Sequence, residues 1–115
     1  MKITLKEAQD KVHNFLKERD WFGTDSNNKY YALAHMMEEL GEVARCISHL
    51  ESKRLKVMDA NSDEMLENLK IELGDVLYHV FKIASSYDID VTEAFHKTMD
   101  KNAKKFPLEK FGQEK

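Results

Sequence analysis

Two short segments of the sequence carry acids in the same arrangement. Residues 39–43 read Glu-Leu-Gly-Glu-Val, and residues 72–76 read Glu-Leu-Gly-Asp-Val. On a helix, where successive residues are about 100° apart, the first acid of each segment falls about 100° from the neighbouring apolar stripe and the second about 160° from it. Equivalent positions on two helices are therefore expected for Glu39 with Glu72 and for Glu42 with Asp75.

An antiparallel pairing of these two helices would gather the four carboxylates around a local twofold axis, with Gly41 and Gly74 allowing close approach. Four such groups repel one another at neutral pH, so a site without a cation should either have raised pKa values or open outward. A hard divalent cation removes the conflict, and oxygen ligands favour Mg²⁺, for which Mn²⁺ can substitute. We predict that this metal is bound by Glu39, Glu42, Glu72 and Asp75. The alternative is that the acids only solvate two helix faces.

The elements that must position these acids are helices. Pro107 is the only proline, so no proline interrupts the helical spacing before it. Capping boxes at Thr4 with Glu7 and at Asp90 with Glu93 open the first and last helices. The predicted helices cover about residues 5–19, 30–50, 63–86 and 90–106, and a polar loop covers about 23–28.

Each of the two acidic helices also carries an apolar stripe at helical spacing. The stripes comprise Leu33, Met36, Leu40, Val43, Ala44 and Ile47 on one helix and Leu66, Leu69, Leu73, Val76, Leu77 and Val80 on the other. We expect one core in a single all-α domain over residues 1–115. The fold would be a four-helix bundle-like domain completed by oligomerisation, since so short a chain builds a small core alone.

Composition narrows the classes of protein further. The lone Cys46 cannot form an intrachain disulfide, and the first residues carry no apolar run typical of a signal peptide, so we expect a cytoplasmic protein. No apolar stretch approaches the roughly 20 residues that span a bilayer, so no membrane partner is expected. The net charge of −3 argues against a nucleic-acid-binding surface.

The acids and their surroundings resemble the signature of the MazG-like nucleotide pyrophosphohydrolases, an all-α family. The motif is Glu38-Glu39-x-x-Glu42 followed by Glu72-x-x-Asp75, and the similarity extends over residues 5–9, 36–44, 71–84, 89–94 and 99–107. The resemblance implies Mg²⁺-dependent hydrolysis of a ribo- or deoxyribonucleoside triphosphate to the monophosphate and pyrophosphate, for a purpose such as cleansing the nucleotide pool. It also implies a homodimer or homotetramer and a helping role for Glu38 toward the metals or the attacking water. The four predicted ligands would be catalytic residues.

Two further groups are candidates for substrate contacts. The resemblance implies that Lys101, Asn102 and Lys105 hold phosphates, whereas compensation of the helix dipole by lysines is the alternative. Trp21 borders the polar loop before the first acidic helix, where its ring could stack on a nucleobase, and core or subunit packing is the alternative. His35 and His79 lack the Glu-x-x-His spacing of di-iron sites, which disfavours redox iron.

Two other functions stay open. A phosphoribosyl-ATP pyrophosphatase would share the helical architecture and the acidic chemistry. A noncatalytic metal-binding helical interaction module would use the same acids to bind a regulatory cation or a basic partner.

Overall fold

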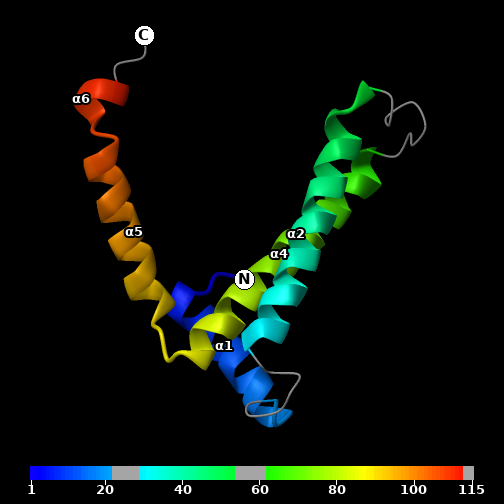
Figure 1. Cartoon of the computed structure of the whole chain (residues 1–115), viewed down its shortest axis with the longest axis vertical. Helices are drawn as coiled ribbons and strands as arrows, with labels where there is room; N and C mark the ends of the chain where they lie inside the picture. The colour runs from blue at the N-terminus through cyan, green and yellow to red at the C-terminus, as the bar shows by residue number, and fades with distance from the viewer. Residues whose placement is uncertain (22–28, 54–61, 113–115) are drawn as a thin grey trace.

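The computed structural model describes residues 1–21, 29–53 and 62–112, and the polar loop predicted at 23–28 lies outside them. The described residues contain helices and no strand, which confirms the all-α prediction. The helices are α1 (Leu5–Glu18), α2 (Lys29–Glu51), α4 (Ser62–Ser86), α5 (Val91–Lys105) and the short α6 (Leu108–Phe111) (Figure 1). None of these described helices combines the length and the apolar character needed to cross a bilayer.

Local capping accounts for where two of the helices begin. The Glu7 backbone amide donates to Thr4 Oγ1 at 3.0 Å, and the Thr4 amide donates to Glu7 Oε1 at 2.7 Å, so the predicted capping box opens α1. Asp90 Oδ1 accepts from the amides of Thr92 and Glu93 at the start of α5. Each bond satisfies an amide that has no partner inside its helix.

The ends of α1 and α4 share one geometry. Asp20 and Asp88 adopt left-handed backbone conformations, with φ of 52° and 56°. The next residue then donates back to the helix: Trp21 N reaches Leu16 O at 3.0 Å, and Ile89 N reaches Ala84 O at 2.9 Å. This is the Schellman arrangement, which here fixes the position of Trp21 directly beyond α1.

The buried side chain of Gln9 ties α1 to the connection between α4 and α5. Its Nε2 donates to Ile89 O at 2.7 Å, and its Oε1 accepts from Val91 N at 2.9 Å. Both bonds reach backbone groups that flank Asp90, the residue that caps the start of α5. Gln9 therefore fixes the point from which α5 leaves the rest of the molecule.

The antiparallel pair α2–α4, hereafter the hairpin, forms the largest helix contact, and α1 packs on α4 (Figure 1). The sides that face each other differ from the predicted stripes. Ala32, Cys46 and Met65 are buried, whereas Leu40 and Leu73 remain 44% and 52% exposed. Much of each predicted apolar stripe is therefore left uncovered within one chain.

The glycines of the two acidic segments are not at a close helix contact within the chain. A Cβ placed on Gly41 or on Gly74 would have no neighbouring atom within 4 Å. The prediction that these residues allow the two helices to approach is thus not supported. The two helices of the hairpin instead contact each other through neighbouring positions that include Glu39 and Glu72, both of which are half-buried.

The four long helices are present as predicted, but one chain does not close them into a compact bundle. α5 packs against α1 and then diverges from the hairpin, so that α5 and the hairpin form the two arms of a V (Figure 1). The radius of gyration is 18.0 Å, against about 13 Å for a compact domain of 100 residues. No residue of α5 is buried, so that helix has an incomplete set of packing partners in the single chain.

Candidate metal centre and neighbouring pocket

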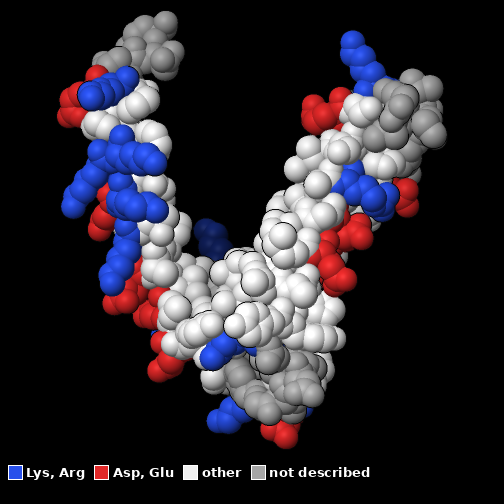
Figure 2. Space-filling model, viewed as in Figure 1, with Lys and Arg blue, Asp and Glu red and all other residues white. Residues whose placement is uncertain are grey.

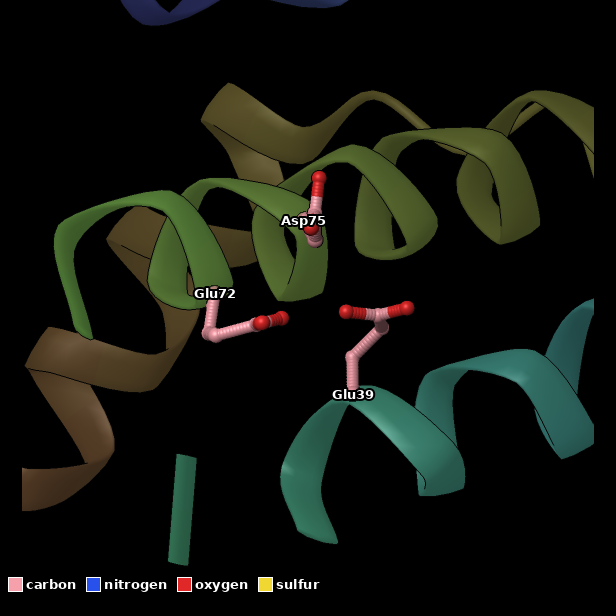
Figure 3. Close-up of side chains that lie close together, drawn as sticks. All are labelled: Glu39, Glu72 and Asp75. Carbon is pink, nitrogen blue, oxygen red and sulfur yellow. The ribbon is translucent and has the colours of Figure 1, made fainter. Parts of the chain in front are cut away.

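Three of the four predicted metal ligands meet across the hairpin. Glu39 projects from α2 toward α4, and Glu72 and Asp75 stand one turn apart on α4 (Figure 3). One carboxylate oxygen from each lies within 4.8 Å of the other two, and all three residues are half-buried. In the part of the chain that the structure describes, this is the group of acids whose spacing could hold a metal ion.

Crowding of these carboxylates changes their proton affinity. A hydrogen bond with the Glu72 side chain, followed by burial and by the charge of Asp75, raises the pKa of Glu39 to about 7. A shared proton is how adjacent carboxylates avoid facing one another with full charge. A divalent cation would relieve the same repulsion, and an all-oxygen set suits Mg²⁺ or Mn²⁺. The residues present therefore fit such an ion.

The other two acids of the motif point to other partners. Glu42 Oε1 accepts from Arg45 Nε at 3.4 Å, and it is not a member of the group of three. Glu38 Oε1 lies 3.0 Å from His35 Nδ1, with its side chain 71% exposed. Glu42 as a fourth ligand and Glu38 as a helper of the metals or the water remain predictions.

An aromatic pocket of about 360 Å³ lies next to the acidic cluster. The α4 side of this pocket begins one turn after Asp75, and its α2 side includes His35, one turn before Glu39. The residues that line it are Trp21, Tyr31, His35, Tyr78, His79 and Lys82. Trp21, predicted to contact a base, is thus part of a hollow that adjoins the predicted metal ligands.

The pocket walls are mostly rings at close range. The Tyr31 and His35 rings have centroids 4.4 Å apart, and the His35 and His79 rings lie nearly parallel at 6.0 Å. On the other side of the pocket, the Tyr78 ring packs edge to face with the Phe15 ring of α1, and the two ring centroids are 6.0 Å apart. Flat walls of this kind suit a planar ligand.

Two polar residues of the pocket are deeply buried. His79 is 9% exposed, its Nδ1 has no hydrogen-bond partner among the described residues, and burial lowers its pKa. Lys82 is 7% exposed, and burial lowers its pKa as well. Sequence reasoning missed Tyr78 and Lys82 as site residues. The available signal was a lysine in the apolar run Val80-Phe81-Lys82-Ile83-Ala84, seven residues after Asp75.

The predicted phosphate-binding residues are not brought to the acidic cluster within one chain. Lys101, Asn102 and Lys105 lie on α5, which diverges from the hairpin (Figure 1). Lys101 and Lys105 are exposed, and the Lys105 ammonium lies 5.5 Å from the centre of the Phe106 ring. Their role toward phosphate remains a prediction.

Comparison with known proteins gives one family and two relatives. The family model of the MazG nucleotide pyrophosphohydrolase domain matches residues 28–108. Uncharacterized protein YpjD of Bacillus subtilis (strain 168) is 31% identical over 98 residues, which cover 85% of this chain and 82% of that protein. Uncharacterized protein YvdC of the same strain is 25% identical over 106 residues, covering 90% and 97% of the two chains. No solved structure matches the chain.

Proposed function

The chain belongs to the MazG nucleotide pyrophosphohydrolase domain family, and we propose from this that it hydrolyses nucleoside triphosphates to monophosphates and pyrophosphate. The observation that carries the proposal is the group of three carboxylates, Glu39, Glu72 and Asp75, beside an aromatic pocket on the same hairpin. The carboxylates suit a metal-bound phosphate chain, and the aromatic pocket suits a planar base.

In the proposed reaction, water attacks the α-phosphorus of the triphosphate. The bond from that phosphorus to the oxygen bridging the α- and β-phosphates breaks, so pyrophosphate leaves and the monophosphate keeps the new oxygen. Mg²⁺ held by Glu39, Glu42, Glu72 and Asp75 would neutralise phosphate charge and make the water more acidic. Glu38 is next to Glu39 in sequence, and we assign it to orienting the attacking water or supporting the ligands.

The distance between cluster and pocket supports one substrate bridging both. Asp75, His79 and Lys82 follow at spacings of four and three residues, so they lie along one side of α4. Seven residues of helix rise about 10.5 Å, which is comparable with a ribose and a base extending away from the α-phosphate. Trp21 would then stack on the base, as its place in the pocket wall allows.

A second copy of the chain would cover the apolar residues that the hairpin leaves exposed. On both helices a leucine directly follows the acid that faces the partner helix, Leu40 after Glu39 and Leu73 after Glu72. The local twofold axis therefore places both exposed stripes on one side of the hairpin. Figure 2 shows that, over most of its length, the side of the hairpin that faces α5 is uncharged. The exposed apolar residues of the hairpin include Leu33, Met37, Leu40, Ile47, Leu66, Leu73, Leu77 and Val80.

Pairing of two such faces gives four helices around a shared core, which is how a chain with a small core of its own reaches bundle packing. We propose a homodimer built on these faces, or a tetramer of two such dimers. In that assembly α5 of one copy lies beside the hairpin of the other. Lys101, Asn102 and Lys105 would then hold the outer phosphates at the partner's acidic cluster.

A panel of ribo- and deoxyribonucleoside triphosphates with Mg²⁺ or Mn²⁺ tests the proposed reaction, with products separated and isotopically labelled water as solvent. We expect pyrophosphate as a product and label in the monophosphate only. Diphosphate and inorganic phosphate as products would contradict attack at the α-phosphorus. Faster turnover of phosphoribosyl-ATP than of every triphosphate would assign the alternative enzyme, and metal binding without any turnover would indicate the noncatalytic module.

A further inference from the structure

His79 is a buried polar residue of the aromatic pocket with an unused hydrogen-bonding atom. Only 9% of its surface is exposed, and its Nδ1 is buried without a hydrogen-bond partner among the described residues. Its neighbours include two rings: the His35 ring lies parallel to it at 6.0 Å, and the Tyr78 ring packs edge to face with centroids 5.2 Å apart. Buried polar groups nearly always have a partner, so an exception in a hollow is a candidate contact for a ligand.

The other histidine of the pocket, His35, differs from His79 in this respect. The His35 Nδ1 lies 3.0 Å from Glu38 Oε1, and 39% of the His35 side chain is exposed. The chain and the solvent therefore both offer polar partners to His35. Of the two histidines, His79 is the one whose polar requirement a ligand would satisfy.

The charge state of the His79 ring limits which chemical group can pair with it. Burial, followed by the charge of Lys82, lowers the pKa of His79, so the imidazole is neutral near pH 7. A neutral imidazole has one N–H donor and one bare nitrogen that accepts. A half-turn about the Cβ–Cγ bond exchanges Nδ1 with Cδ2 in nearly the same volume, so the ring can present a nitrogen to the pocket without movement of α4. A hydroxyl group both donates and accepts, so it suits either kind of nitrogen.

The position of His79 along α4 decides which part of a bound nucleotide it meets. His79 follows Asp75 by four residues, which is about one turn and a rise of about 6 Å. In the proposed function the acidic cluster marks the α-phosphate, and the sugar hydroxyls of a nucleotide lie at a comparable distance from that phosphorus. His79 is therefore at the level of the sugar, and the base extends beyond it.

We propose that the His79 imidazole binds a hydroxyl group of the nucleotide sugar and makes that hydroxyl a requirement for efficient turnover. The inference rests on the proposed function, because it needs a nucleotide whose phosphates occupy the acidic cluster. It extends that function from nucleoside triphosphates in general to those that carry the recognised hydroxyl. The 2′- and 3′-hydroxyls share this chemistry, and the substrates of the test distinguish them.

The wild-type protein provides the first test, with four triphosphates of the same base: the ribonucleotide and its 2′-deoxy, 3′-deoxy and 2′,3′-dideoxy forms. We expect kcat/KM for the dideoxy form to be roughly 10- to 100-fold below that for the ribonucleotide, because the imidazole then stays unpaired. The two monodeoxy forms show which hydroxyl carries the effect. Equal or higher kcat/KM for the dideoxy form overturns the inference and leaves the proposed function intact.

Trp21 provides a measurement of binding that does not need turnover, since it is the only tryptophan of the chain and lines the same pocket. Ribo- and dideoxynucleotide analogues with a non-hydrolysable α,β-bridge should change its fluorescence, and the ribo analogue should bind roughly 10-fold more tightly or better. Equal affinities would contradict a contact between His79 and the sugar. If no nucleotide is turned over and no analogue changes the fluorescence, the proposed function itself fails, and the inference with it.

His79→Phe tests whether this residue causes the preference. The variant keeps a flat ring but removes both nitrogens, so the ratio of kcat/KM for the ribonucleotide over the dideoxy form should fall to within a few fold of one, mainly through losses with the ribonucleotide. His13→Phe is the control and should keep the wild-type ratio, since His13 is an exposed histidine of α1 that lines a different hollow. A purely structural role for His79 would lower turnover of all four triphosphates alike and leave the ratio unchanged, which would overturn the proposal.

A second variant covers the case in which His79→Phe fails to fold, as judged by circular dichroism. His79→Leu replaces the imidazole by a smaller apolar group that neither donates nor accepts a hydrogen bond, so it should also bring the ratio to within a few fold of one. Retention of the full wild-type ratio in a folded His79→Leu variant would contradict recognition of the hydroxyl by His79.

Discussion

The hairpin and the α5 arm carry charges of opposite sign, and they differ in how completely one chain assembles them. On the hairpin, Glu39, Glu72 and Asp75 are half-buried and close together, so helix packing has already fixed their geometry. On α5, the lysines are exposed and no residue is buried. Metal binding is therefore expected to be a property of one chain, whereas contact of the α5 lysines with phosphate depends on a second copy.

The largest expected effect comes from removing one carboxylate of the hairpin. Glu72→Gln keeps the size of the side chain but loses a ligand charge, and removing a group that merely supports a metal ligand already costs 10- to 100-fold. We therefore expect turnover to fall more than about 100-fold, with weaker Mg²⁺ binding by calorimetry and unchanged helicity. Glu39→Gln, Glu42→Gln and Asp75→Asn should behave alike.

Glu67→Gln provides the control for these variants, since Glu67 is an exposed acid of the same helix that pairs with Lys70 at 2.7 Å. It should retain wild-type metal affinity. Wild-type affinity in two or more of the four ligand variants would contradict the four-ligand site. Wild-type affinity in Glu42→Gln alone would restrict the ligands to the three acids that already meet in the single chain.

The second-largest effect is expected on dimerisation, from a change in the exposed apolar face of the hairpin. Leu66→Glu places a charge on the exposed stripe and should weaken dimerisation by roughly 100-fold, since a buried unpaired charge is poorly tolerated at an interface. Asn68→Glu adds the same charge to an exposed residue on another side of α4 and should leave assembly unchanged. Sedimentation velocity across a concentration series measures both.

The Leu66→Glu variant also tests the dependence of catalysis on assembly. If α5 contacts phosphate only in the partner's site, a monomeric variant should keep its Mg²⁺ affinity but lose most turnover. Full activity in a monomer would show instead that the two arms of one chain close on the substrate. A wild-type protein that is monomeric at all concentrations tested would rule out the proposed interface.

A smaller effect is expected from the α5 lysines. Lys101→Ala and Lys105→Ala should each lower kcat/KM by roughly 10-fold if the contact is desolvated, and by much less if the lysine stays in solvent. Part of the loss should fall on kcat, because negative charge develops on the leaving pyrophosphate. Lys97→Ala serves as the control, since Lys97 is 78% exposed and lies near Glu93. Metal affinity should not change in any of the three.

The smallest effect is a pH dependence of stability in the metal-free protein. The pKa of Glu39 is about 7 in the folded chain, against an ordinary value of 4.5, so the folded state binds more protons between these pH values. Its stabilising contribution is full below pH 4.5 and is lost as pH rises toward and through 7. Thermal unfolding in chelator should thus show a decline across this window that Glu39→Gln lacks. Added Mg²⁺ should restore more stability at pH 8 than at pH 5. An equal decline in the variant would assign it to other groups.

Local sequence patterns were sufficient to predict the helices and to place Glu39 opposite Glu72. The Thr4–Glu7 capping box and the Asp90 cap depend on residues within one turn, so they could be recognised without any tertiary information. The repeat of acids 33 positions apart depends only on helical periodicity and on two helices running antiparallel. This was enough to predict that Glu39 and Glu72 occupy equivalent places across the hairpin.

The tertiary structure alone decided which side of each helix is covered. Periodicity shows that Leu40 and Leu73 belong to an apolar stripe, but it cannot show whether the same chain or another copy buries them. In the folded chain the hairpin closes on the side of Glu39 and Glu72, so these leucines stay exposed. Lys82 is buried for the same reason, because its side of α4 turns inward beside His79. Burial depends on contacts between residues distant in sequence, and no local pattern specifies those contacts.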